Sequence, residues 1–577
     1  MPQNLVITAR FFLGIGLVTI LGSEPTMANM YWCPRTDRSW NSTEIAIYES
    51  ACVQGSISGR LDLVGGNREV QASFIRNLLI APRFREIREE GALTFSQLFI
   101  EGPLKLQDAQ ISSDILISNS SFLSSVDVSG ASIDGNLSLL NTNVNGELDL
   151  EGLRLNGSLY LGDKPDITPD PTKPRGGTNI KSVDGEGAKI LGNVAIEGAN
   201  IPNGLEFSYA SIAGYFEMAR SITPRIDLVS GDFGKQFVLV DDDLRGPHHT
   251  PNSNVLNAEF ESFFSIDMYL AYFNQTVFLD RSVTNNPINA GDALINGSLS
   301  IIGTHLSSLV APGVRINGEL LMGFNDKAIL PFKPGGKEPA LVREDQGPMT
   351  TFAPGSTLDI RYATINAIAA PEQLSVWPSK LYLTNFHLNS FTPENCTSNI
   401  EFPVELNASC ADDLAFFKRW LSLDPDSEHI MQSYQMIEDL LASRGDKDEA
   451  DQIGFARGDH KLRSHFNFPY ISFLYQLVYR ETVGYGYYPE WSVWWILFLT
   501  ILGALIYRRT DQAQQRGNKI GLTFSFDLLL PLIRLDEENY KVKFFGPTKY
   551  YFYFHRLAGW ILGSFLVSAI SLFGNSR

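Results

Sequence analysis

The chain has 577 residues, of which 44% are hydrophobic and 19% are charged, and its formal net charge is −18. This composition excludes a highly charged, disordered chain, and the length predicts several structural units. The acidic balance argues against nucleic acid as a partner, because neutralising phosphates requires a basic surface. The 4 cysteines are too few for a disulfide-dense small domain.

Residues 1–28 have the pattern of a secretory signal peptide. Arg10 precedes an apolar run from Phe11 to Gly22. The segment Thr26–Ala28 follows, and its small residue Ala28 suits cleavage directly after it. The run of about 12 residues is shorter than the ~20 that cross a bilayer as a helix. We therefore expect residues 1–28 to be removed after export; the alternative is an uncleaved membrane anchor.

An 11-residue repeat follows. The clearest consecutive copies are Ile133–Leu139 (IDGNLSL), Val144–Leu150 (VNGELDL) and Leu155–Leu161 (LNGSLYL). Apolar and polar residues alternate within each copy, which is typical of a strand buried on one face. The same register returns in Ile190–Ile196, and weaker copies are Ile57–Leu63, Ile295–Ile301 and Ile316–Leu320.

The second inward position of each copy is always Gly, Ser or Asn. In parallel stacking this small position lies above itself in successive strands, whereas in an antiparallel meander it does not. We therefore predict a mainly β fold in which residues 29–395 form an extracytoplasmic parallel β-solenoid, with two or three 11-residue faces per coil. The alternative is an antiparallel β-sandwich.

The outer wall and two interruptions are the places to look for binding. Outward positions are mostly Asp, Asn, Ser, Glu and Arg, without an aromatic stripe, so the wall is suited to cations or a basic partner, or it is a solvated face. Residues 162–187 and 323–355 are rich in Pro and Gly and are predicted to be inserted loops. Loops on a rigid scaffold often carry function.

The cysteines form two pairs that are close in sequence, Cys33 with Cys52 and Cys396 with Cys410. In an oxidising compartment each pair can close a short loop, and neither spacing is that of a zinc site or a CxxC motif. Two structural disulfides are predicted; the alternative is four free thiols.

Residues 396–483 are predicted to form a helical collar. Helices are expected at Asp412–Leu423, Ser427–Ser443 and Asp446–Arg463, with Gly445 as the C-cap of the second. The arrangement resembles a single helical hairpin of the tetratricopeptide type. One hairpin is too few for a peptide-binding groove, so the collar is expected to pack between solenoid and membrane.

Two apolar runs, Trp491–Tyr507 and Leu557–Gly574, predict two transmembrane helices with Tyr and Trp near the headgroups. Residues 484–507 are the membrane entry and first span, 508–556 a cytoplasmic loop, and 557–577 the second span and tail. The loop holds nine basic and five acidic groups, so the positive-inside rule places it in the cytoplasm and everything before Trp491 outside. A pair of buried core helices is the alternative.

Three motifs accompany these spans. Gly559 and Gly563 form GxxxG, which permits close helix packing against the first span or another protomer, and the latter would give a homo-oligomer. Residues 524–535 are amphipathic and are expected to lie on the inner membrane surface. Thr482–Gly486 reads TVGYG, as in a potassium-channel filter, but residues 466–479 contain Pro469 and are too short for the preceding span, which favours a turn at headgroup level.

The G-x-L-x-L strands combine with several further segments, which cover nearly the whole mature chain: Leu358–Ile365, Trp377-Pro378 with Leu381–Leu383, Tyr434 through Gly445 to Ala450, Gly484–Pro489 and Phe526–Pro531. Together they resemble a family of bacterial membrane proteins with degenerate pentapeptide-like, β-helical repeats and a C-terminal two-helix membrane domain. Its members are often labelled membrane-associated oxidoreductases. The resemblance implies redox activity, but no residue here supports it and no catalytic residue is carried over.

The sequence contains no dinucleotide fingerprint, P-loop, CxxC or GxSxG motif. The adjacent His248 and His249 point apart in regular structure, and Asp241–Asp243 lacks the spaced loop of a Ca²⁺ site. We therefore predict no catalytic, cofactor or metal residues. The predicted function is a binding or scaffolding module at the cell envelope, with the bilayer and a protein or envelope polymer as partners. The alternatives are a polysaccharide-active enzyme, the oxidoreductase of the family label, and an ion channel.

Overall fold

The computed structural model describes residues 36–54, 68–84, 93–163, 177–245, 264–322, 350–370, 377–393, 413–425, 430–464, 470–515, 521–530 and 536–575. The chain forms two compact units: Met1–Ala411 with Leu423–Pro425, and Asp412–Ser422 with Asp426–Arg577. The predicted signal peptide, the copy at 57–63, Cys33, Cys396 and Cys410 lie outside the described residues. Cys52 lies in a helix, and both predicted disulfides stay predictions.

The strands of the first unit, here called the strand stack, belong to three sheets. The first sheet has 15 strands: β1 (Glu69–Gln71), β3 (Phe99–Glu101), β4 (Leu104–Lys105), β7 (Ser121–Phe122), β8 (Val126–Asp127), β11 (Asn143–Asp149), β14 (Thr178–Asp184), β17 (Ala199–Asn200), β18 (Leu205–Glu206), β21 (Ile226–Asp227), β25 (Ile266–Asp267), β29 (Ile288–Asn289), β33 (Leu309–Val310), β36 (Thr357–Asp359) and β38 (Lys380–Tyr382).

The second sheet has 20 strands: β2 (Leu93–Ser96), β5 (Gln110–Ile111), β6 (Ile115–Ser118), β9 (Ser132–Ile133), β10 (Leu137–Leu140), β12 (Arg154–Leu155), β13 (Leu159–Gly162), β15 (Lys189–Ile190), β16 (Val194–Glu197), β19 (Ser211–Ile212), β20 (Phe216–Ala219), β22 (Asp232–Phe233), β23 (Phe237–Val240), β26 (Tyr272–Phe273), β27 (Val277–Phe278), β30 (Leu294–Ile295), β31 (Leu299–Ser300), β34 (Arg315–Leu321), β37 (Thr364–Ala370) and β39 (His387–Pro393). The third has four: β24 (Asp243–Leu244), β28 (Val283–Thr284), β32 (His305–Leu306) and β35 (Thr351–Phe352).

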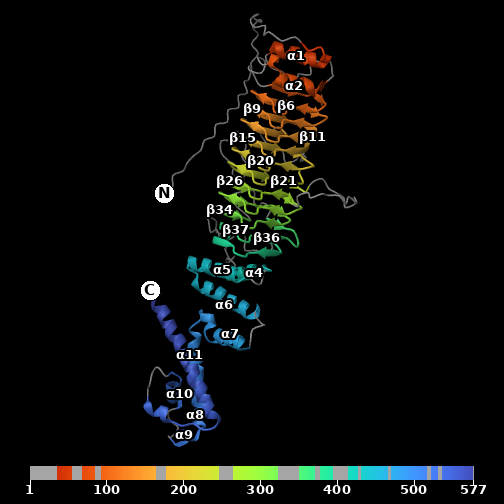
Figure 1. Cartoon of the computed structure of the whole chain (residues 1–577). Helices are drawn as coiled ribbons and strands as arrows, with labels where there is room; N and C mark the ends of the chain where they lie inside the picture. Colours follow the sequence, from red (N-terminus) through yellow and green to blue (C-terminus); the bar gives the residue numbers. More distant parts are fainter. Residues whose placement is uncertain are drawn as a thin grey trace, which may run out of the picture. The chain divides into compact units, whose positions relative to one another are not determined.

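The pairing register fixes how the repeat folds. Leu137 pairs with Ile115 on one side and with Leu159 on the other, and each partner is one coil of 22 residues away. Successive 11-residue units therefore alternate between the second and first sheets, so that a coil has two main faces. Every pairing between the strands described here is parallel, which confirms the predicted direction of stacking and excludes the antiparallel sandwich. This is the arrangement expected of a β-solenoid (Figure 1).

The core between the two main sheets is apolar and includes a ladder of phenylalanines. Phe216 stacks on Phe237 with ring centroids 4.6 Å apart, and Phe233 stacks on Phe273 at 5.0 Å. All four side chains are buried. Like side chains meet because the parallel register places each one beneath its counterpart in the next coil.

Two helices, which the sequence patterns did not predict, precede the stack (Figure 1). They are α1 (Ser42–Gln54) and α2 (Ala72–Ile80), and a short 3-10 turn η2 (Pro82–Phe84) follows. Asn41 and Glu44 form a reciprocal capping box at the start of α1, with both bonds at 2.8 Å. Helix α2 packs against β1, β4 and β5, and thus covers the end of the stack, where bare strand edges would otherwise invite pairing with other chains.

Both predicted loops are partly wrong. Thr351–Phe352, inside the predicted insertion 323–355, is strand β35, which pairs with β32. Thr178–Asp184, inside the predicted insertion 162–187, is strand β14, and it pairs with β11 through Val144 and Ile180. Alternate burial of Thr178 and Ile180 marks it as a strand, but the insertion before it had shifted the repeat out of register. Residues 164–176 and 323–349 lie outside the described part of the chain, so their role in binding stays a prediction.

The second unit is helical. Its elements are α4 (Asp413–Leu421), α5 (Ile430–Arg444), α6 (Lys447–Ser464), α7 (Tyr470–Val483), η5 (Gly484–Gly486), α8 (Trp491–Arg508), α9 (Asp511–Gln515), α10 (Gly521–Leu529), η6 (Glu537–Lys541) and α11 (Pro547–Asn575). Helices α5 and α6 form the predicted hairpin. Gly445 has φ +93°, its N–H donates to Ala442, and the N–H of Asp446 donates to Leu441, so the predicted C-cap is confirmed as a Schellman motif.

The TVGYG segment is a helix end and a turn. Thr482 and Val483 close α7, and the Thr482 hydroxyl donates to the carbonyl of Val478 within that helix. Two glycines of α6 leave room for the rings of tyrosines later in the chain. Gly458 lies against Tyr485, and Gly454 lies against Tyr487. Thr482–Gly486 therefore does not form the extended backbone whose carbonyl groups line a potassium-channel filter. Instead, the aromatic ring of Tyr485 packs against α6.

Helix α8 is the one helix of the described residues that is long and apolar enough to cross a membrane, judged by length and composition. The second predicted span lies in α11, but side-chain burial is described in this helix only up to Val567. The second span therefore stays a prediction.

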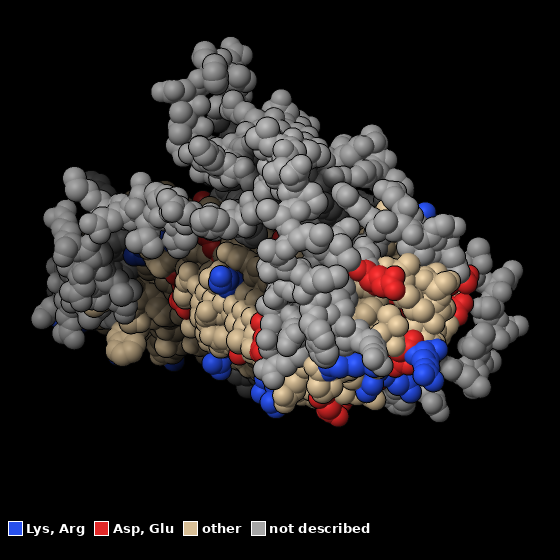
Figure 2. Space-filling model, turned by 90° about the horizontal axis from the view of Figure 1, so that it is seen from above, with Lys and Arg blue, Asp and Glu red and all other residues tan. Residues whose placement is uncertain are grey.

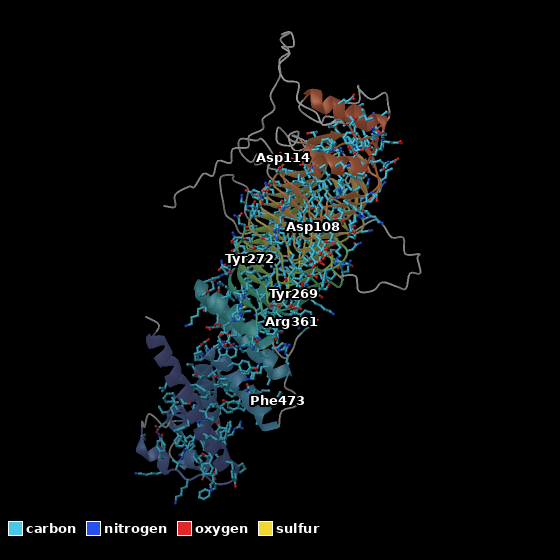
Figure 3. All side chains as sticks on the ribbon, turned by 45° about the horizontal axis from the view of Figure 1, so that its top comes forward. Asp108, Asp114, Tyr269, Tyr272, Arg361 and Phe473 are labelled. Atoms are coloured by element: carbon cyan, nitrogen blue, oxygen red, sulfur yellow. The ribbon has the colours of Figure 1, made fainter. Side chains whose placement is uncertain are left out.

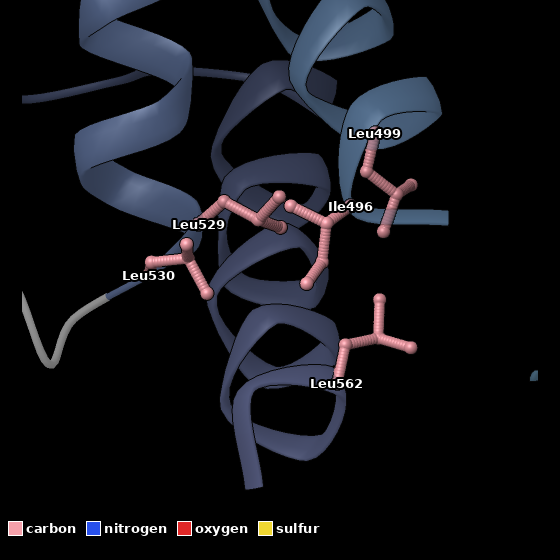
Figure 4. Packing of buried hydrophobic residues seen from close by; sticks show 5 residues of the cluster. All are labelled: Ile496, Leu499, Leu529, Leu530 and Leu562. Atoms are coloured by element: carbon pink, nitrogen blue, oxygen red, sulfur yellow. The ribbon is translucent and has the colours of Figure 1, made fainter. Parts of the chain in front are cut away.

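The described part of the predicted amphipathic segment packs within the second unit, and its place on a membrane surface stays a prediction. Phe524, Asp527, Leu528 and Leu529 of α10 are buried, and the helix packs between α8 and α11. Apolar residues of all three helices meet in one cluster: Ile496, Leu499, Leu529, Leu530 and Leu562 (Figure 4).

The glycines of α11 have a partner within the chain. Gly559 lies against the backbone of Leu529 in α10, where an added Cβ would overlap the carbonyl oxygen. Gly563, one turn on, is buried. The GxxxG motif thus permits close approach, as predicted, but Gly559 approaches α10, which was neither of the partners expected from the sequence.

Candidate functional site

Carboxylates stack in register along the first sheet, and all are partly exposed except the buried Asp227. We call this set, with one side chain from each of six consecutive coils, the acidic column: Asp127, Asp149, Asp184, Glu206, Asp227 and Asp267. Each follows a buried apolar residue at the end of its strand. Paired strands are roughly 4.8 Å apart, so the row is about 24 Å long.

Local turn chemistry explains why acids stand at this position. Asp127 accepts the backbone N–H of Ser129 (3.1 Å), and Asp149 accepts that of Glu151 (3.0 Å). These Asx turns end the strands and lead into corners with positive φ. Asn289, the next residue of the row after Asp267, accepts the N–H of Gly291 in the same way (3.0 Å). The turn needs a side-chain oxygen, but it does not need a negative charge.

Three carboxyl groups of the acidic column, and Glu147 beside it, have a raised pKa. Burial raises the pKa of Asp149, and the charges of Asp127 and Asp184 raise it further. Burial also raises the pKa of Glu206, followed by the charge of Asp227. The pKa values of Glu147 and Asp267 are raised by burial and then by neighbouring column carboxylates.

Basic groups compensate only part of this charge. Arg225 pairs with Asp227 at 2.7 Å, and Lys181 lowers the pKa of Glu147 as a minor effect. Basic and acidic side chains both appear on the face seen in Figure 2. The column is defined by the register of its strands.

Exposed tyrosines lie at the corners beside this row, where the sequence had suggested no aromatic stripe. Tyr209, three residues after Glu206, is 61% exposed with φ +57°, and Tyr269 is exposed two residues after Asp267. Tyr362 occupies the same kind of corner three residues after Asp359. Tyr269 is labelled on the strand stack in Figure 3. These tyrosines come from separate coils, so single repeats gave no signal for them.

A metal centre finds no support in the described side chains. Among them, no group of three or more His, Cys, Asp or Glu residues is placed to hold a metal ion. In the Asp241–Asp243 run, Asp241 pairs with Arg281 (3.0 Å) and Asp243 with Arg245 (2.8 Å). His248 and His249 lie outside the described residues.

The acidic column meets part of what a polysaccharide-active enzyme needs, because carboxyls of raised pKa lie near Lys181 and Arg225. A cavity in the described part of the chain lies elsewhere, on α7 and α8 of the second unit. The enzymatic alternative therefore stays a prediction.

No protein-family model, no curated protein and no solved structure matches this chain.

Proposed function

We propose that this chain is a membrane-anchored, extracytoplasmic β-solenoid whose acidic column binds a basic segment of a partner protein at the cell envelope. The observation that carries the proposal is the in-register row of six carboxylates, several with raised pKa, on a rigid sheet. Burial is the largest cause of the raised pKa values, and a cationic ligand lying along the row would relieve the repulsion between neighbouring carboxylates that adds to it.

A polypeptide fits this row better than a single ion. The carboxylates are spaced along a line and do not converge, so a bound cation would meet few of them at once. Lysine and arginine side chains on an extended segment can reach successive rungs, and the exposed tyrosine corners offer cation–π contacts to the same side chains.

The membrane part of the proposal rests on the second unit. Helix α8 has the length and composition of a span, and large apolar side chains are exposed on α7, α8 and α11. Examples are Leu474, Leu497 and Trp560. The excess of basic residues in 508–556 assigns that segment to the cytoplasm, with a second span at 557–574 returning the chain.

The binding test uses the purified full chain and a fluorescent oligolysine peptide. The variant Asp127→Asn, Asp149→Asn, Asp184→Asn keeps the turn oxygens and removes three column charges. A matched control changes three exposed acids of the second sheet instead: Asp134→Asn, Asp232→Asn, Glu319→Gln.

We expect the column variant to bind the peptide about tenfold more weakly or worse, with a shallower salt dependence, and the control to bind like the unmodified chain. If both variants lose affinity equally, the peptide responds only to the net charge of the chain, and the acidic column is not a specific binding surface. No loss in the column variant would refute the assignment of the row as the binding surface.

Orientation is tested separately with reporters that are active in the cytoplasm only. A fusion after Phe545 should be active, and a fusion after Ser390 should not. The reverse pattern would overturn the proposed topology.

A further inference from the structure

Near the start of α8, four aromatic residues and one acidic residue line a shallow cavity that is widely open to the surface. Its volume is about 370 Å³, and the residues that line it are Glu481, Trp491, Trp494, Trp495 and Phe498. The indole N–H of Trp495 donates to the backbone carbonyl of Glu481 at 2.7 Å, which ties the end of α7 to the first turns of α8. Trp495 and Phe498 meet edge to face, with centroids 5.8 Å apart.

The charge around the cavity favours a cation. Arg480 is shared by two carboxylates: it bonds Asp459 at 2.7 and 3.2 Å, and Glu481 at 2.5 Å. One guanidinium against two carboxylates leaves a net negative charge. The side chain of Glu481 is 48% exposed, so it can still accept from a ligand.

The aromatic rings add to the same preference. Trp494 is 69% exposed, and Trp495 is also exposed. Indole faces attract ammonium groups through their quadrupole, and aromatic cages of this composition recognise alkylated ammonium ions. An anion would meet ring faces and a carboxylate, both of which repel it.

We propose that this cavity binds the ammonium group of a phospholipid headgroup, with Glu481 as the charge partner and Trp494 and Trp495 as the ring walls. The inference rests on the proposed anchoring, because these residues occupy the first turns of α8, where an inserted helix meets the headgroups. The volume of the cavity lies at the small end of the range for ligand sites, which suits a headgroup.

The probes are short-chain phosphatidylethanolamine, phosphatidylcholine and phosphatidylglycerol, added to the full chain in detergent. Bound lipid is counted by native mass spectrometry, and tryptophan fluorescence follows the titration. We expect the two ammonium lipids to bind about tenfold more tightly than the glycerol lipid. Free choline and ethanolamine are tested separately. If they bind much more weakly than the lipids, the ligand is a lipid. If they bind as tightly as the lipids do, the lipid proposal is wrong and the site binds a soluble amine.

Glu481→Gln should abolish most of the preference for ammonium lipids while keeping the shape of the side chain. Glu490→Gln is the matched control, since Glu490 is exposed nearby and does not line the cavity. Trp494→Leu is a second, independent variant that should reduce ammonium binding without changing charge. If Glu481→Gln and Trp494→Leu both leave the headgroup preference intact, or if phosphatidylglycerol binds equally well, the inference is wrong.

Alkaline extraction of membranes separates this inference from the proposed function. An unmodified chain that is extracted like a peripheral protein would refute the anchoring itself. A chain that resists extraction but shows no headgroup preference would refute only the ammonium site.

Discussion

A column of glycines in the second sheet offers the sharpest test of like-on-like stacking. Gly135, Gly157, Gly192 and Gly214 lie in successive coils, and the N–H of each donates to the carbonyl of the one before at 3.1, 2.9 and 3.0 Å. In Gly157→Ala, the new Cβ would overlap the carbonyl oxygen of Gly135. This obstacle is backbone of the adjacent coil, so it cannot rotate away.

The expected cost has two parts. Forcing a methyl group into a packed site costs about 1–3 kcal/mol. Spreading the coils would also weaken the hydrogen bond from the N–H of Ser158 to the side chain of Asn136 (2.7 Å), worth about 1 kcal/mol. We therefore expect the free energy of local opening around Gly157 to fall by about 2–4 kcal/mol.

Gly152→Ala is the matched control, because Gly152 has φ +62° and no atom lies within 4 Å of its added Cβ. The change should cost about 1 kcal/mol of backbone strain only. Stacked repeats do not unfold in a single step, so amide hydrogen exchange of β10, β13 and β16 is the appropriate measurement. If the two alanine variants lose equal protection, the glycine column does not set the coil spacing and the reasoning fails.

Three further outcomes are expected. The midpoint of urea unfolding should rise as the pH falls from neutral toward about 4, because carboxyls of raised pKa such as Asp149 bind protons more readily in the folded chain; Asp149→Asn should reduce this rise. Gly559→Leu should cost at least about 2 kcal/mol of thermal stability by pushing α11 from the Leu529 carbonyl, and a neutral result would contradict the α10 packing. Leu270→Gly should stabilise by about 0.5 kcal/mol, since Leu270 is exposed at φ +57°; a clear loss would show that its side chain packs.

Several features of the fold were readable in the sequence, since they depend on local spacing. Strand alternation and the small column indicated parallel stacking, and Gly445 marked the end of α5. The apolar run that begins at Trp491 gave α8 its bounds almost to the residue. In α2, the apolar residues Phe74, Ile75, Leu78 and Leu79 carried a helical signal that was overlooked beside the stronger strand repeat.

The sequence by itself determined the strand period, the direction of stacking and the residues facing the core, because alternation and small positions are local properties that repeat. Only the tertiary structure decided that a coil has two main faces, that α10 is buried between α8 and α11, and that carboxylates from coils 22 residues apart form one row. These outcomes depend on which distant backbone groups pair. That choice is set by hydrogen bonds and packing between coils, which no single repeat contains.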